Sequence, residues 1–85
     1  MLNDSQQIVA ELPKNSAEKI VIAKAEYRGQ AFVDIRVWWQ PDNAPEHVAT
    51  KKGVAVPIGY LQELISALQL LEADLEYLNS LRGAA

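Results

Sequence analysis

The residues best suited to chemistry lie between Tyr27 and Trp39, and the chemistry that they indicate is binding. This segment reads as a strand end, a turn that contains Gly29, and a long second strand. In the second strand, Ala31, Val33, Ile35 and Val37 alternate with Phe32, Asp34, Arg36 and Trp38. A period of two places the two sets on opposite faces of a sheet. The second face would then offer two aromatic rings beside an arginine and a carboxylate.

Exposed rings interleaved with guanidinium groups suit a single-stranded nucleic acid, because bases stack on the rings and phosphates pair with the cations. The alternative is an ordinary amphipathic strand whose aromatic side chains are covered by another part of the chain or by a partner. The strand pattern by itself leaves both interpretations open.

The residue types needed for catalysis are scarce. His47 is the only histidine and the chain has no cysteine, so neither a Ser-His-Asp nor a Cys-His arrangement has support. Asp34 is expected to pair with Arg36 on the same strand face. The glycines are isolated and form no phosphate-binding loop. We predict no enzymatic activity, no metal site and no cofactor.

The formal net charge of −3 argues against a generic nucleic-acid binder, which would be basic. The charge is unevenly distributed, since residues 19–56 hold six basic and four acidic residues. This is compatible with one anion-binding face of modest, salt-sensitive affinity. Because alternate turns of an antiparallel meander fall at one end of the sheet, Arg28 and the Lys51-Lys52-Gly53 segment are expected to flank the aromatic face together.

The rest of the N-terminal two thirds reads as short strands and turns. Residues 1–17 form an extension that is expected to be either a short strand around Ile8 or without regular structure, with a turn over residues 12–16. Strands are predicted at 19–27 and from 30 to about 39 or 40, and short strands at 47–50 and 54–56. The folded domain is predicted to span residues 18–85.

From Pro57 onward the leucines recur at intervals of three and four, which predicts a helix of about six or seven turns that ends near Gly83. This apolar stripe is longer than four short strands could cover. Its distal half is therefore expected to pack on a second copy of the chain. The alternative is a helix folded back wholly within its own monomer. The residues predicted to form the dimer seam are Leu64, Leu68, Leu71, Leu75 and Leu78.

The N-terminus has no basic residue followed by an apolar core, and no apolar run reaches membrane-spanning length. Without cysteines the chain cannot depend on disulfides. These features predict a soluble protein inside the cell.

Three motifs, in this order and spacing, carry a resemblance to a known family. They are Tyr27-Arg28-Gly29, then Val33-Asp34-Ile35-Arg36 followed by Trp38-Trp39, then Lys51-Lys52-Gly53-Val54 before a leucine-rich helix. Over roughly residues 20–71 the chain resembles the C-terminal domain of the transcriptional coactivator positive cofactor four. The resemblance implies an α+β fold, with a curved four-stranded antiparallel sheet followed by a long, kinked C-terminal helix. It also implies a homodimer formed through helices and β-ribbons.

The function implied by the resemblance is single-stranded DNA binding without strong sequence preference, in replication, recombination, repair or transcription. The serine- and lysine-rich regulatory region of eukaryotic members is absent from this sequence, so coactivator regulation of that kind is not expected. We expect a prokaryotic or phage member that is cytoplasmic or nucleoid-associated. Its expected partners are single-stranded DNA, a second copy of itself, and replication, recombination or transcription proteins. The alternative is an interaction dimer that kept the fold and binds nucleic acid weakly or not at all.

The resemblance also nominates individual residues. Tyr27 and Trp39 match base-stacking aromatics, and the basic positions are matched by Arg28, Arg36, Lys52 and, beside it, Lys51. Strict alternation instead puts Trp38 on the face of Arg36, so both tryptophans are candidates, and a bulge or the strand end would reconcile the two. Ala25 and Gln30 stand where family members have basic residues, which weakens the expected phosphate binding.

Overall fold

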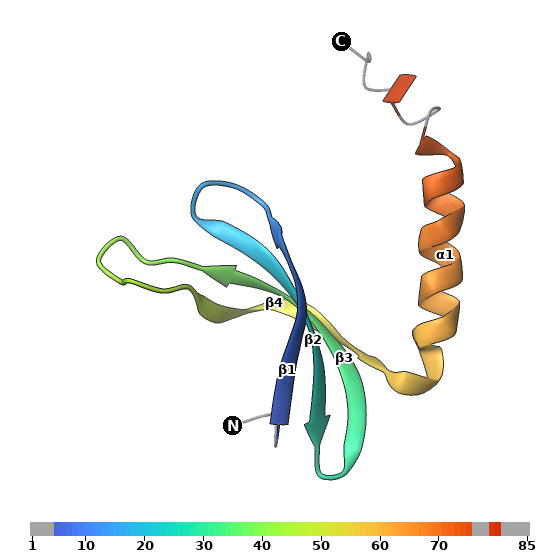
Figure 1. The fold of residues 1–85 in the computed structure, drawn as a ribbon, viewed down its shortest axis with the longest axis horizontal. Coiled ribbons are helices and arrows are strands. Elements are labelled where there is room, and N and C mark those ends of the chain that lie inside the picture. Colours follow the sequence, from blue (N-terminus) through green and yellow to red (C-terminus); the bar gives the residue numbers. More distant parts are fainter. Residues whose placement is uncertain (1–4, 76–78, 81–85) are drawn as a thin grey trace.

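The computed structural model describes residues 5–75 and 79–80. Four strands are followed by a short 3-10 helix and one α-helix (Figure 1). The elements are β1 Ser5–Pro13, β2 Glu18–Tyr27, β3 Gln30–Trp39, β4 Val48–Pro57, η1 Ile58–Tyr60 and α1 Leu61–Ala73. The sheet has the order β1-β2-β3-β4, and every neighbouring pair is antiparallel. This confirms the predicted α+β fold of a four-stranded antiparallel sheet followed by a helix.

The β2–β3 hairpin turns through only two residues, Arg28 and Gly29. Both have positive φ angles, 54° and 78°, which is the backbone of a type I′ turn, whose twist matches that of the flanking strands. The ladder then runs without interruption from the pair Tyr27 and Gln30 to the pair Glu18 and Trp39. Because opposed residues share a face, this register confirms the predicted division of β3 into two faces.

The N-terminal segment forms a full strand. β1 has nine residues and pairs with β2 as far as Pro13, which lies opposite Lys19. The turn predicted over residues 12–16 therefore begins too early. Pro13 is compatible with the sheet because β1 is an edge strand, where a missing N–H costs no ladder hydrogen bond.

β4 is one ten-residue strand, so the prediction of two short strands at 47–50 and 54–56 is wrong. Its register shifts between Arg36, which faces Gly53, and Trp38, which faces Ala49. Residues 50–52 thus oppose Val37 alone, as a bulge. Gly53 was interpreted as part of a turn, but a glycine inside a strand often marks a bulge.

The bulge also shows that the predicted position of Lys51 and Lys52 is wrong. They lie opposite Val37 and not at the end of the sheet that carries Arg28. The seven residue steps along β3 from Gln30 to Val37 separate the two sites by about 24 Å. The predicted pairing of the two basic turns at one end of the sheet is therefore wrong.

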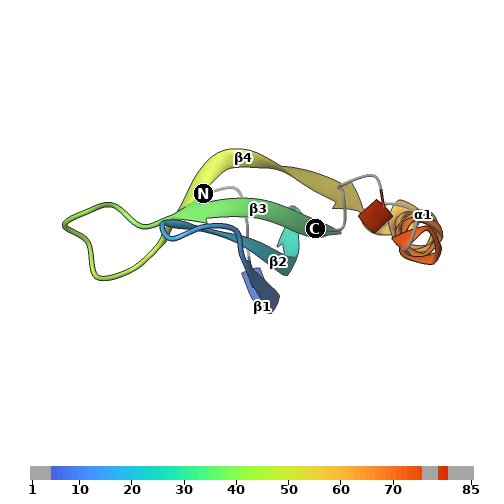
Figure 2. The same ribbon diagram turned by 90° about the horizontal axis from the view of Figure 1, so that it is seen from above.

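One face of the sheet is more buried than the other. The buried residues Val21, Ala23, Ala25 and Asp34 share the face of Arg36. No helix of residues 5–75 covers this face (Figures 1 and 2), so its burial comes from neighbouring side chains of the twisted sheet itself. The apolar face remains more open, and Val54 there is 53% exposed. The described residues thus leave the apolar face without a cover.

Helix α1 stands beside the sheet beyond η1 (Figures 1 and 2), and none of its residues is buried. The alternative of a helix folded back on its own sheet is therefore wrong for the described residues. α1 has 13 residues and ends at Ala73, earlier than predicted. The predicted seam residue Leu78 and the predicted terminator Gly83 lie outside the described residues. Within the described chain, no helix is long and apolar enough to cross a membrane.

Gly53 provides a test of the bulge. A Cβ atom there would lie 2.7 Å from the Ile35 carbonyl oxygen and 2.9 Å from the Arg36 Cα, both backbone atoms. We expect Gly53→Ala to lower the free energy of unfolding by about 1–3 kcal/mol, as overpacking does. Gly59→Ala is the control, since its Cβ would meet nothing within 4 Å. Urea denaturation of both variants measures the difference, and equal stability would contradict the close β3–β4 approach.

Candidate nucleic-acid interface

Two of the nominated aromatic rings are open to a ligand. Trp39 is 44% exposed and Tyr27 is 38% exposed. Trp38 is half-buried, and its Nε1 atom is buried without a hydrogen-bond partner in the described part of the chain. The Lys19 ammonium lies 5.9 Å from the centroid of the Trp38 ring, within the range of a cation–π interaction. Trp39 is therefore the more accessible of the two indoles.

The register settles which face each tryptophan occupies. Trp39 lies opposite Glu18 on β2 and Val48 on β4. The bulge is in β4, so alternation along β3 continues unchanged to its end. Trp38 thus shares the face of Arg36, and Trp39 shares the apolar face.

Lys51 and Lys52 are exposed and close to Trp39 along the neighbouring strand. Within the described chain, neither ammonium group forms a salt bridge. Alternation from Gly53, which faces Arg36, puts Lys52 on the face of Trp39. The same alternation puts Lys51, the next residue in the bulge, on the opposite face. We call Trp39, Lys52 and the neighbouring Lys51 the tryptophan–lysine patch.

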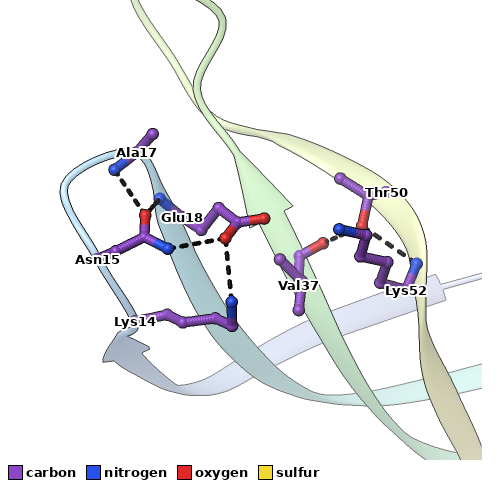
Figure 3. Close-up of polar contacts among 7 residues, drawn as sticks. All are labelled: Lys14, Asn15, Ala17, Glu18, Val37, Thr50 and Lys52. Atoms are coloured by element: carbon purple, nitrogen blue, oxygen red, sulfur yellow. Dashed lines mark hydrogen bonds and ion pairs between the residues drawn. The ribbon is translucent and has the colours of Figure 1, made fainter.

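Glu18 adjoins this patch because it lies directly opposite Trp39. Its Oε1 accepts hydrogen bonds from Asn15 Nδ2 at 2.8 Å and from Lys14 Nζ at 3.0 Å (Figure 3). The pKa of Glu18 is lowered first by the Asn15 hydrogen bond, then by that of Lys14, and also by the charges of Lys14 and Lys52. Lys52 has the smallest of these effects, and by alternation it lies on the same face of the sheet as Glu18.

The turn between β1 and β2 is built by Asn15. Its Oδ1 accepts hydrogen bonds from the backbone N–H groups of Ala17 at 2.9 Å and Glu18 at 2.8 Å (Figure 3). The backbone N–H of Gln40 in turn donates to the Ala17 carbonyl at 2.9 Å. This turn therefore holds both Glu18 and the end of β3 in place beside the tryptophan–lysine patch.

Arg36 is bound within the sheet. Its Nη2 donates to Asp34 Oδ1 at 2.9 Å, and its Nε lies 3.2 Å from both Asp34 oxygens. Asp34 is only 4% exposed, and the predicted ion pair is present. The Nη1 of Arg36 donates to the Thr50 carbonyl at 3.1 Å. The charge of Arg36 is thus balanced by a buried partner.

Tyr27 and Arg28 form a second patch at the other end of the hairpin, which we call the hairpin-tip patch. The Arg28 Cζ lies 5.2 Å from the centroid of the Tyr27 ring, so the guanidinium and the ring interact. By register Tyr27 is on the face of Arg36, opposite to that of Trp39. The nominated residues therefore fall into two patches instead of one, and Arg36 and Trp38 belong to neither.

Lys19 and Glu18 were not nominated by the sequence analysis, although they contact or adjoin the two tryptophans. The length of the hairpin turn could have identified both residues. A two-residue turn at Arg28 and Gly29 fixes the register, and counting back along β2 places Glu18 opposite Trp39 and Lys19 opposite Trp38. Among the described residues, no cluster of three His, Asp or Glu side chains could hold a metal ion.

The fold and the surface patches define a class of protein. Its members have an open antiparallel meander with a C-terminal helix, and their surface carries exposed aromatic rings beside cationic side chains. Solved structures of this class match the chain closely. A PC4 homologue from Burkholderia pseudomallei K96243 is 28% identical, with a TM-score of 0.70 in a tetragonal crystal form and 0.71 in an orthorhombic form. The match covers 80% of this chain and 98% of that one in the first form, and 81% and 92% in the second.

A third structure shares the fold at 24% identity and a TM-score of 0.69, and covers 95% of this chain and 92% of that chain. It is the bacteriophage T5 homologue of the eukaryotic transcription coactivator PC4, implicated in recombination-dependent DNA replication. The family model described as Transcriptional Coactivator p15 (PC4) matches residues 14–67. The chain belongs to this family, the same one that its motifs resemble. No curated protein matches the chain.

Glu18 supports a prediction on pH. Since its pKa is below the ordinary value of 4.5 in the folded chain, its stabilising effect is present above pH 4.5 and is lost as the pH falls through the lowered value. We expect Glu18→Gln to be less stable than the wild type at neutral pH, and the difference to vanish in strong acid. Denaturant midpoints at the two pH values measure this. A difference that persists in acid would show that the charge of Glu18 is not its cause.

Proposed function

We propose that this protein binds single-stranded DNA as a homodimer, without strong sequence preference. The observation that carries the proposal is the tryptophan–lysine patch. Trp39 is an exposed indole, Lys52 lies on the same face and Lys51 is adjacent in the bulge, and neither ammonium has a carboxylate partner in the described chain. This combines a stacking platform with phosphate neutralisation. Membership of the PC4 family supports the same function.

Trp39 supplies the stacking surface in this mechanism, and Lys51 and Lys52 neutralise phosphates. Stacking of one base on an aromatic ring contributes roughly 1–3 kcal/mol and tolerates any base, because every base has a π-face. Each phosphate neutralised by an ammonium releases counterions, so the affinity falls with salt. Sequence preference is accordingly weak and salt dependence strong.

The hairpin-tip patch is a second contact point in the proposal, with stacking on Tyr27 and phosphate contact by Arg28. Although Tyr27 and Trp39 occupy opposite faces by register, strands twist along their length, so opposite faces at the two ends of a long ribbon need not point in opposite directions. The strong twist of the sheet is visible in Figure 1. A second copy of the chain would add the same two patches again.

The biological role proposed is the protection or presentation of transient single strands. The phage T5 homologue is implicated in recombination-dependent DNA replication, which supports replication or recombination ahead of transcription. A protein with this role would act as a binder and not as an enzyme, in contact with chromosomal or phage DNA in the cytoplasm or nucleoid.

Self-association is supported by the surface that the single chain leaves open. A folded monomer of 9.4 kDa would expose roughly 5,000 Å², whereas this chain exposes 6841 Å². The excess includes Leu68 and Leu71 of α1, which are 54% and 56% exposed, and Leu75 just beyond its end, which is 51% exposed. A second copy that covers α1 and the apolar sheet face would remove this surface from water, as obligate dimers do.

The alternative function is an interaction dimer with weak or no nucleic-acid binding. The balanced charge of Arg36 and the net charge of −3 favour it. The two functions differ in a binding assay at low ionic strength, where a binder of single strands retains a labelled oligonucleotide and an interaction dimer does not.

Trp39→Ala tests the binding function. Because it removes the stacking surface, we expect the affinity for a fluorescein-labelled single-stranded oligonucleotide to fall at least tenfold, about 1.4 kcal/mol. Tyr60→Ala is the control, since Tyr60 is 61% exposed but lies on η1, outside both patches. Fluorescence anisotropy at low and high salt measures both variants. Unchanged binding by Trp39→Ala would exclude the stacking role.

Leu71→Asp and Leu75→Asp test the dimer seam. A carboxylate in an apolar interface loses its hydration without a partner, so we expect monomers or unfolded protein. Leu70→Asp is the control, because Leu70 is 71% exposed and lies on a different side of α1 from Leu68 and Leu71. Sedimentation analysis measures the oligomeric state. Stable dimers of both seam variants would contradict this placement of the interface.

A further inference from the structure

The β4 bulge is stabilised by side-chain hydrogen bonds in place of regular backbone pairing. Residues 50–52 oppose Val37 alone, and extra residues in a bulge lose regular ladder pairing. The Thr50 side chain supplies hydrogen bonds instead. Its Oγ1 donates to the Val37 carbonyl at 2.7 Å and accepts from the Lys52 N–H at 3.1 Å (Figure 3). The Thr50 hydroxyl therefore ties the backbone of Lys52 to β3.

Arg36 holds the same bulge through a backbone carbonyl. Its Nη1 donates to the Thr50 carbonyl at 3.1 Å, while Nε and Nη2 are fixed by Asp34. Asp34 is 4% exposed and the Arg36 side chain is 20% exposed, so the pair is shielded from water. Gly53 lets β4 approach closely here, as a Cβ would lie 2.9 Å from the Arg36 Cα. A chain of contacts thus leads from Asp34 through Arg36 and Thr50 to Lys52.

We propose that Asp34, Arg36 and Thr50 are positioning residues that set the backbone from which Lys51 and Lys52 reach phosphate. This inference rests on the proposed binding function and changes the part that Arg36 plays in it. Arg36 acts on the ligand through the bulge, because direct phosphate binding would require it to leave a buried carboxylate that has no other cationic partner among the described residues. The two lysines remain the charges that meet the ligand.

The positioning role explains why the guanidinium, and not an ammonium, suits position 36. A planar guanidinium donates in several fixed directions at once, and here it spans a carboxylate and a backbone carbonyl. A network that is complete within the sheet is present before the ligand arrives. The lysines are then presented without rearrangement of the strand.

Thr50→Val tests the proposal without changing any charge. It keeps the branched shape and removes the hydroxyl with both of its hydrogen bonds. We expect the affinity for labelled oligothymidylate to fall about fivefold, which is within the net contribution of such bonds. The salt dependence should keep its slope, because the number of cations is unchanged. Thr50→Ser, which retains the hydroxyl, should bind as the wild type does. Lys52→Gln should instead lower the slope by about one.

Asp34→Asn separates positioning from direct contact. If Arg36 bound phosphate itself, removal of the competing carboxylate would strengthen binding. A positioning network predicts weaker binding even though a negative charge has been removed. A gain of affinity in Asp34→Asn would overturn the proposal. Circular dichroism of the variant confirms that it is folded.

The wild-type protein provides a test that needs no variant. Because the Lys52 N–H is bonded to Thr50 Oγ1, its hydrogen exchange should be slow although the residue is exposed. Fast exchange at Lys52 in the folded wild type would overturn the positioning role. If Thr50→Val binds normally while Lys52→Gln and Trp39→Ala bind weakly, the positioning role fails and the binding function stands. If Lys52→Gln and Trp39→Ala also bind normally, the binding function itself fails.

Discussion

The two-residue turn at Arg28 and Gly29 is the constraint on which the rest of the structure depends. Positive φ at both residues closes the hairpin in the shortest way, and the register of every pair between β2 and β3 follows from it. A slip by one residue would exchange the two faces of a strand. The burial of Asp34, the exposure of Trp39 and the approach of Glu18 to Trp39 are all consequences of this one turn.

The sheet is unusual because its more buried face is the one with aromatic and charged side chains. Asp34 can be buried there because Arg36 supplies three hydrogen bonds to its carboxylate, whereas an unpaired buried carboxylate would be strongly destabilising. Val33, Ile35 and Val37 of β3 face the side that the described residues leave open. The folded monomer therefore exposes an apolar face that a second copy could cover, which agrees with the proposed dimer.

Local charge matters more to this surface than the net charge. An acidic protein can hold an anion if ammonium groups without carboxylate partners gather at one place, as Lys51 and Lys52 do in the described chain. Glu18 lies near them, but Asn15 and Lys14 engage its Oε1. The turn that carries Glu18 thus limits the repulsion between this carboxylate and a phosphate chain.

Much of the fold and part of the site could be predicted from the sequence, and the division has a physical reason. The alternation along β3, the turn at Gly29 and the start of a leucine-rich helix depend on residues close in the chain, so their periods determine them. Other features depend on contacts between residues far apart in the chain. These are the single bulged strand at 48–57, the pairing of the N-terminal residues with β2, and the separation of Arg28 from Lys52. The sequence alone determined which residues could stack or carry charge. The tertiary structure decided that Trp39 and not Trp38 is open, and that Arg36 is bound to Asp34, because burial and ion pairing are set by neighbours that only folding brings together.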